Sequence, residues 1–129
     1  MIVLDASALA DVLLDRPRGR RTASRLRGEE LHAPHLVSIE VASVIRRSTL
    51  TREIRAETGG RALDDLRMFP LVRHDHEPFL PRIWQLRSNV SAYDAVYVAL
   101  AEALDVPLLT CDARLARAPL PGVQIELMT

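Results

Sequence analysis

Short apolar runs alternate with longer, helix-compatible stretches along the whole chain. The runs predict strands at residues 2–4, 31–35, 70–74, 106–109 and 123–127. The stretches between them predict helices at residues 6–14, 18–28, 38–50, 51–68, 77–87, 92–104 and 113–118. Within residues 38–50, helical spacing predicts a buried face made of Ile39, Val41, Val44 and Ile45. Strands that alternate with helices are typical of a parallel sheet, so the pattern predicts an α/β domain with helices on both faces of the sheet.

The composition fits one globular domain over residues 1–129. A chain of 129 residues can bury roughly two-thirds of its unfolded surface, and 48% of its residues are hydrophobic, which is ordinary for such a domain. No apolar run approaches the ~18 residues that a membrane span needs, and the N-terminal stretch lacks the features of a secretory signal. We therefore expect no membrane contact. The lone cysteine, Cys111, cannot form an internal disulfide, so we expect a protein of the reducing cytoplasm.

The charged residues exclude several classes of enzyme. The formal net charge is zero, and all 17 basic residues are arginines because the sequence contains no lysine. The missing lysine excludes P-loop nucleotide hydrolases, Schiff-base enzymes, response-regulator receivers and haloacid-dehalogenase-type phosphatases. No glycine-rich turn follows the first predicted strand, which excludes dinucleotide binding.

Several acidic residues lie where the sequence otherwise predicts burial. Asp5 and Asp112 each follow an apolar strand and precede a helix, so in a parallel sheet both lie at the carboxyl edge, where such folds bind ligands. Glu40 and Asp94 lie near the starts of helices, flanked by residues that favour burial. Taken singly, each acid can be explained as a helix cap or a first-turn acid, and Ser91 with Asp94 fits a capping box.

Taken together, these acids indicate a metal site. A buried, unpaired carboxylate costs several kcal/mol unless it is protonated, paired or bound to a metal. No basic residue lies between Asn89 and Ala113 that could neutralise Asp94 locally. Carboxylates that are brought close together repel, and a hard divalent cation such as Mg²⁺ resolves that conflict with one or two carboxylates and several waters. An acidic pocket that holds Mg²⁺ is typical of phosphate chemistry.

The segments that carry these acids resemble the signature blocks of PIN domains, in the family's order: IVLDASAL, VSIEVASVIRR, SAYDAVYVALAEAL and LLTCDARLARA. The resemblance covers essentially the whole chain and is strongest to the VapC-type toxins of bacterial toxin–antitoxin pairs. It implies a single PIN domain over residues 1–129, with a three-layer α/β/α fold and a central parallel sheet of four to five short strands. It also implies a metal-dependent endoribonuclease that acts as a toxin on RNA, with a cognate antitoxin as partner and a homodimeric assembly.

The same motifs imply an acidic quartet and two supporting hydroxyls: Asp5, Glu40, Asp94, Asp112, Ser7 and Thr110. The preference of Mg²⁺ for carboxylate ligands and the resemblance to PIN domains together favour Asp5 and Asp94 as its direct or water-mediated ligands, with Mn²⁺ as a substitute. Glu40 and Asp112 then complete the pocket and hold the attacking water or a second ion. Because a water attacks and not the ribose 2′-OH, hydrolysis should leave a 5′-phosphate and a 3′-hydroxyl.

Arginines near these acids are candidates for RNA contact. Arg114 and Arg117 follow the last acid of the quartet, and Arg46 lies with Arg47 near the end of the helix that carries the glutamate. Residues 16–27 hold six further arginines, which fit equally a solvated helix face with structural ion pairs and a ridge that follows RNA phosphates. If these arginines bind RNA, the affinity should fall steeply with salt.

Tyr93 and Tyr97 flank Asp94 and could stack on RNA bases, but the apolar character of their helix favours core packing for both. An alternative from another functional class stays open: an RNA- or partner-binding PIN module whose pocket is catalytically silent. A metal-dependent nuclease that acts on DNA is a third hypothesis. Degradation of RNA that requires Mg²⁺ or Mn²⁺ and stops with EDTA would distinguish the enzyme from the binding module.

Overall fold

A parallel sheet of five strands forms the centre of the structure, a computed structural model that describes residues 1–129. The strands are Ile2–Leu4 (β1), Leu31–Pro34 (β2), Val72–His74 (β3), Leu108–Thr110 (β4) and Ile125–Leu127 (β5). They lie in the order β3-β2-β1-β4-β5, and every neighbouring pair is parallel. Every strand predicted from the sequence is present, so the predicted parallel α/β architecture is confirmed.

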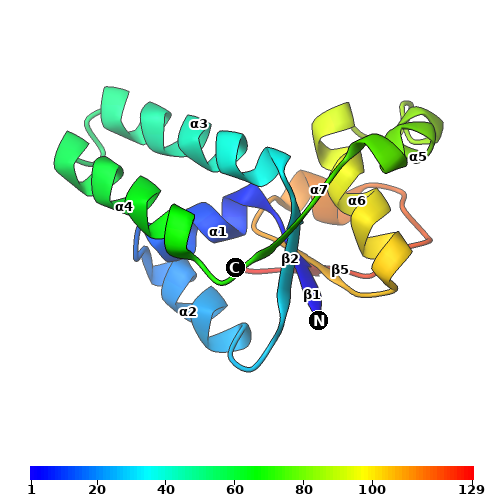
Figure 1. Ribbon diagram of the computed structural model, residues 1–129, viewed down its shortest axis with the longest axis horizontal. Coiled ribbons are helices and arrows are strands. Elements are labelled where there is room, and N and C mark those ends of the chain that lie inside the picture. Colours follow the sequence, from blue (N-terminus) through cyan, green and yellow to red (C-terminus); the bar gives the residue numbers. More distant parts are fainter.

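Helices cover the sheet on both faces. They are Ala6–Leu13 (α1), Pro17–Arg25 (α2), Leu36–Leu50 (α3), Ala56–Met68 (α4), Leu80–Gln85 (α5), Ala92–Leu104 (α6) and Ala113–Arg117 (α7), with a 3-10 turn at Glu77–Phe79 (η1). Figure 1 shows α1 to α4 on one side of β1 and β2, and α5 and α6 on the other. This is the three-layer α/β/α arrangement expected from the sequence.

The core follows from the apolar strands and from one helix that is apolar all round. The side chains of β1 are fully buried, as expected for the central strand of a covered parallel sheet. Residues 95–101 of α6 are all buried, and α6 packs against β1, β2 and β4. A helix with no polar face is stable only inside the molecule, so α6 forms the core layer on its side of the sheet.

Two predicted helices differ from the observed ones, one in where it begins and one in which face it buries. Residues 51–55 form a turn, so α4 begins only at Ala56. On α3 the buried face is made of Val37, Val41 and Ile45, whereas Ile39 is 71% exposed. The prediction that Ile39 faces the core is wrong, because two helical residues span about 200° and place Ile39 on the side opposite Val37.

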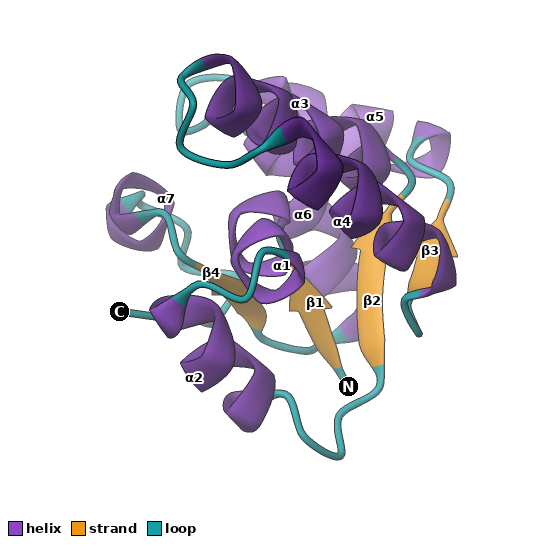
Figure 2. Ribbon diagram, turned by 90° about the vertical axis from the view of Figure 1, so that its left-hand side faces the viewer, coloured by secondary structure: helices purple, strands orange, loops and turns teal.

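The order of the strands creates a switch point between β1 and β4. From β1 the chain moves outward through β2 to β3, then returns through α5 and α6 to form β4 on the other side of β1. Figure 2 shows β1, β2 and β3 with their arrowheads toward the same edge, and α1 starts directly after β1. In open α/β sheets, ligands bind at the carboxyl ends of strands where the order reverses. No helix in the structure combines the length and the apolar character that a membrane crossing would require.

Candidate active site

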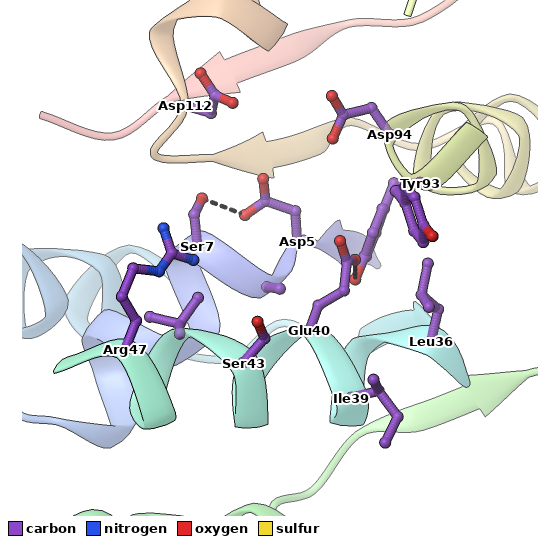
Figure 3. Close-up of a pocket in the computed structure, with 13 residues that line it drawn as sticks. Asp5, Ser7, Leu36, Ile39, Glu40, Ser43, Arg47, Tyr93, Asp94 and Asp112 are labelled. Carbon is purple, nitrogen blue, oxygen red and sulfur yellow. Dashed lines mark hydrogen bonds between the residues drawn. The ribbon is translucent and has the colours of Figure 1, made fainter. Parts of the chain in front are cut away.

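Acidic side chains from four elements line one pocket at this switch point. Asp5 follows β1, Glu40 lies in α3, Asp94 lies in the first turn of α6 and Asp112 follows β4. The pocket has a volume of about 460 Å³. Figure 3 shows the four carboxylates arranged around it. The fold therefore brings together acids that lie far apart in the sequence.

Hydrogen bonds hold both carboxylate oxygens of Asp5. Its Oδ1 accepts from the Ser7 hydroxyl at 2.7 Å and from the Ala8 amide at 3.0 Å, so Asp5 is also the N-cap of α1. Its Oδ2 accepts from the Thr110 hydroxyl. The same Thr110 hydroxyl accepts from the Asp112 amide at 2.9 Å. Ser7 and Thr110 therefore fix the direction of the Asp5 side chain and link it to the loop that carries Asp112.

Tyr97 positions Glu40. The two residues lie on α6 and α3, and the buried Tyr97 hydroxyl donates to Oε1 of Glu40 at 2.7 Å. Burial raises the pKa of Tyr97 above its ordinary value, so the phenol stays protonated and remains a donor. The prediction that Tyr97 packs in the core is confirmed, but its contact with Glu40 was not predicted. The signal available in the sequence was its position three residues after Asp94, which places both on one face of α6.

The environment of the pocket raises the pKa of three of its four carboxyls. Burial raises the pKa of Asp5, Glu40 and Asp94 above their usual values. Mutual repulsion adds to this, because the charge of Asp94 raises the pKa of Asp5 and of Glu40, and the charge of Asp112 raises that of Asp94. Hydrogen bonds from the protein offset part of the increase. Such perturbed acids in a cleft are typical of functional sites.

The protein supplies little positive charge to these acids. Asp5, Glu40 and Asp94 form no ion pair, and Asp112 has only the exposed Arg114 at 3.8 Å. The buried Asp11 contrasts with them, since it pairs with two arginines at 3.0 and 2.6 Å. The fold thus neutralises a structural acid but leaves the pocket acids uncompensated. A cation from solution can fill that role.

Comparison with known proteins places the chain in a family. The family model for the PIN domain matches residues 2–120. This chain belongs to the PIN-domain family. It is 43% identical over 128 residues to a protein named Ribonuclease VapC12 from Mycobacterium tuberculosis, with 99% of each chain covered. It is 44% identical to Ribonuclease VapC1 from the same organism, covering 98% of this chain and 96% of that protein.

Solved structures share the fold of this PIN domain at low sequence identity. VapBC2 from Rickettsia felis, solved bound to a DNA fragment from its promoter, matches with a TM-score of 0.72, 16% identity and all of both chains covered. A toxin–antitoxin complex from Klebsiella pneumoniae matches with a TM-score of 0.70 and 16% identity over 95% of each chain. The three-layer fold expected from the resemblance is confirmed by these matches.

The acids of the PIN domain can be compared with the ligand sets that different metal ions need. No group of three acidic, histidine or cysteine side chains lies close enough together to hold a metal as a set. This does not suit Zn²⁺ or Ca²⁺, which take more ligands from the protein. Mg²⁺ keeps several waters and needs only one or two carboxylates. Asp5 and Asp94 both line the pocket, and the charge of Asp94 raises the pKa of Asp5, so a hydrated ion of this kind would suit these two carboxylates.

The candidate RNA-binding arginines lie at different places around the PIN domain. Arg114 and Arg117 are exposed on α7, beyond Asp112, and do not line the acidic pocket. Arg46 lines a separate hollow between α3 and α4, whereas its neighbour Arg47 lines the acidic pocket. One residue further along a helix turns a side chain by about 100°, so sequence proximity did not separate these two arginines.

Most arginines of residues 16–27 take part in structural contacts. Four of them form ion pairs with acids of this chain: Arg16, Arg18, Arg20 and Arg25. A fifth, Arg21, donates to the backbone carbonyl of Thr129 at 2.9 Å. Of the two interpretations left open by the sequence, these contacts support the solvated helix face with ion pairs.

Tyr93 lies at the mouth of the pocket. Its side chain is 62% exposed, so the prediction that it packs in the core is wrong. Tyr93 is in the first turn of α6, before the fully buried segment that begins at Ala95. The apolar sequence of the helix as a whole concealed this change of environment at its N-terminal end.

Proposed function

We propose that this PIN domain is a metal-dependent endoribonuclease that hydrolyses RNA phosphodiester bonds and acts as the toxin of a toxin–antitoxin pair. The observation that carries the proposal is the pocket lined by Asp5, Glu40, Asp94 and Asp112, of which only Asp112 forms an ion pair within the protein. The names of its VapC relatives, which call them ribonucleases, support the choice of RNA as substrate.

In this proposal Asp5 and Asp94 bind the ion, and Mg²⁺ or Mn²⁺ satisfies their chemistry. Such an ion lowers the pKa of the attacking water and offsets the negative charge that grows on the phosphoryl oxygens. Ser7 and Thr110 keep Asp5 in position through their hydrogen bonds. Since water is the nucleophile, the products carry a 5′-phosphate and a 3′-hydroxyl.

Glu40 and Asp112 orient the attacking water or hold a second ion. Tyr97 occupies only Oε1 of Glu40, so the other carboxylate oxygen is free to accept a proton from a water. The pKa of Glu40 is raised toward neutral pH, and a general base works best when its pKa lies near the pH of the reaction. Asp112 is held at the N-terminus of α7 by its own contact with the Arg114 amide at 2.8 Å.

The expected partner is an antitoxin made in the same cell. The structural neighbours include VapBC and other toxin–antitoxin complexes, which supports this assignment. A cationic side chain that enters the pocket would suit the uncompensated acids, and we expect the protein to act in the cytoplasm as a homodimer. A small antitoxin gene immediately upstream of the coding sequence, and formation of a stable complex on co-expression, would test this part.

The experiment that tests the activity is incubation of the purified chain with a mixed RNA pool in Mg²⁺, in Mn²⁺ and in EDTA. Cleavage is expected with either ion and none with EDTA, and the Asp5→Asn variant should be inactive while remaining folded. Ligation-based analysis of the products should find 5′-phosphate ends. Parallel incubation with single- and double-stranded DNA separates a ribonuclease from a general nuclease. RNA binding without cleavage in any ion would support the catalytically silent module instead.

A further inference from the structure

The acidic pocket has two unlike ends. At one end lie Tyr93, Ile39 and Leu36, which we call the apolar shelf, and at the other end lies Arg47. Figure 3 shows the shelf on one side of the carboxylates and the Arg47 guanidinium on the other, with Ser43 between them on α3. The pocket therefore changes from apolar through acidic to basic along its length.

Helical geometry produces this order on α3. Leu36, Glu40, Ser43 and Arg47 are separated by four, three and four residues, so they lie along one face of the helix. At 1.5 Å per residue, this row is about 16 Å long. α6 adds Tyr93 beside Asp94, just as Ile39 lies beside Glu40. Each end of the row is thus held by a rigid element at a fixed separation from the acids.

The shelf is unusually exposed for its composition. Tyr93 and Ile39 are 62% and 71% exposed, although both are large, and Figure 3 shows Leu36 between them on the same side of the pocket. Exposed apolar groups that gather at a pocket usually mark a binding surface. A purely apolar partner would bury the neighbouring carboxylates at a high cost. A nucleotide avoids this cost. The flat, apolar faces of its base can cover the shelf alone, while its phosphate is directed away from those faces.

We propose that the apolar shelf binds the base of a nucleotide next to the scissile phosphate, with the base stacked on the ring of Tyr93, and that Arg47 binds a backbone phosphate on the opposite side of the acids. This rests on the proposed function and deepens it, because it makes the substrate an unpaired strand. Single-stranded RNA is recognised largely by stacking of its splayed bases on aromatic side chains, whereas bases inside a duplex are not free to stack in this way.

The first test separates the Tyr93 ring from its hydroxyl. Stacking of one base makes a contribution whose loss weakens binding by roughly 5- to 150-fold. We therefore expect Tyr93→Ala to raise the KM for a short single-stranded RNA by about that factor with a much smaller change in kcat, and Tyr93→Phe to leave KM within about twofold of the unaltered protein. Trp84→Ala is the matched control, because Trp84 is 68% exposed, aromatic and outside the pocket.

The second test identifies the contacted base. A series of the same RNA is made with one abasic nucleotide at each position in turn. At the position whose base lies on Tyr93, removal of the base and Tyr93→Ala delete the same contact, so their effects on the free energy of RNA binding should not add. At the other positions the two effects should add. Additive effects at every position, or an unchanged KM for Tyr93→Ala, would overturn the proposal.

The outcomes distinguish this proposal from the proposed function. If the unaltered protein cleaves RNA but Tyr93→Ala cleaves with the same KM, the nuclease assignment holds and the shelf assignment fails. If the unaltered protein cleaves no RNA with any ion, the nuclease assignment fails. Light scattering tests whether a second copy of the chain occupies the shelf instead: a Tyr93→Ala protein that loses its dimeric state with KM unchanged identifies the shelf as a contact between protein chains and overturns the proposal.

Discussion

The hydroxyl of Thr110, at the end of β4, donates a hydrogen bond to Oδ2 of Asp5, at the end of β1, across 105 positions of sequence. The same hydroxyl accepts from the amide of Asp112. Because β1 and β4 are neighbours in the sheet, a single buried side chain connects an acid from the start of the chain with one from near its end. Thr110 therefore fixes the Asp5 side chain relative to the loop that carries Asp112.

Replacement of Thr110 tests that connection. Thr110→Val keeps the shape of the side chain but leaves a buried carboxylate oxygen and a backbone amide without their partner, at a cost of about 1–3 kcal/mol in the free energy of unfolding. We expect denaturant unfolding to show this loss and cleavage to slow by at least tenfold. Thr110→Ser is the control, since it retains the hydroxyl. Equal activity of the Val and Ser variants would contradict the positioning role.

Asp5→Asn and Asp94→Asn should abolish cleavage without unfolding the protein. Loss of one group that stabilises a transition state typically lowers kcat by about a hundredfold or more, and loss of a metal ligand removes more than one such interaction. A neutral amide relieves the burial of a charge at Asp5 but loses the acceptor for the Thr110 hydroxyl, so the two effects oppose each other and the variant should remain folded in EDTA. The change expected in calorimetry is the loss of Mg²⁺ binding. An Asp5→Asn variant that melts as before but still cleaves RNA would rule out its role as a ligand.

Divalent ions should stabilise the protein more at neutral than at acidic pH. The carboxyls with raised pKa values bind protons more tightly when folded than when unfolded, so the stability gained from protonation is complete below the unfolded pKa and is lost as pH rises through the folded pKa. Mg²⁺ binds only the deprotonated carboxylates. At a concentration of 100 times its Kd, it adds about 2.7 kcal/mol to the free energy of unfolding. Thermal melting with and without Mg²⁺ at pH 5 and pH 7.5 checks this. An equal shift at both pH values would contradict it.

Tyr97→Phe should change the pH dependence of cleavage. The variant keeps the buried ring but removes the hydrogen bond to Glu40, which holds the pKa of that carboxyl down. The lost hydrogen bond should cost about 1 kcal/mol of stability. The acidic limb of the pH–rate profile should move to higher pH, because more base is needed to ionise Glu40. A profile that falls in rate but does not move along the pH axis would show that Glu40 does not titrate in the reaction.

Arg47→Gln should weaken RNA binding and reduce its salt dependence. Each phosphate contact contributes close to one unit to the slope of log K against log salt concentration, somewhat less for single strands. Arg46→Gln is the matched control, because it makes the same change of charge one residue away on α3, in a different hollow. The binding isotherms are measured with Asp5→Asn to prevent cleavage. If both substitutions lower the slope equally, RNA responds to the overall charge of α3 and not to the pocket.

The sequence was sufficient for the parallel sheet covered on both faces and, together with the resemblance to PIN domains, for the four acids. Strands such as residues 2–4 and 106–109 are apolar throughout, which only a parallel sheet with both faces covered accommodates, and their ends point to one edge. Asp5 and Asp112 follow directly from that rule. Glu40 and Asp94 lie in helices, and their convergence with the strand acids depended on the resemblance to PIN domains and not on the spacing of residues.

The surroundings of the acids were harder to predict. Periodicity gives the average face of a helix, but not which face meets a neighbouring element or where that contact begins. Ile39 lies between the buried Val37 and Val41 on the other face of α3, and Tyr93 lies just before the buried segment of α6. The choice between Arg46 and Arg47 depends on a rotation of about 100°, which a single sequence does not specify. The contact between Tyr97 and Glu40 joins residues 57 positions apart and needs the packing of α3 against α6.

The dispersal of the acids along the chain has a consequence for synthesis. A ribosome that has released only the first hundred residues has made Asp5, Glu40 and Asp94, but not β4, Thr110 or Asp112. The central strand then lacks its neighbour on one side, and the pocket lacks a wall. We therefore expect a nuclease built in this way to stay inactive while it emerges beside messenger and ribosomal RNA, and to gain activity only once translation is almost complete.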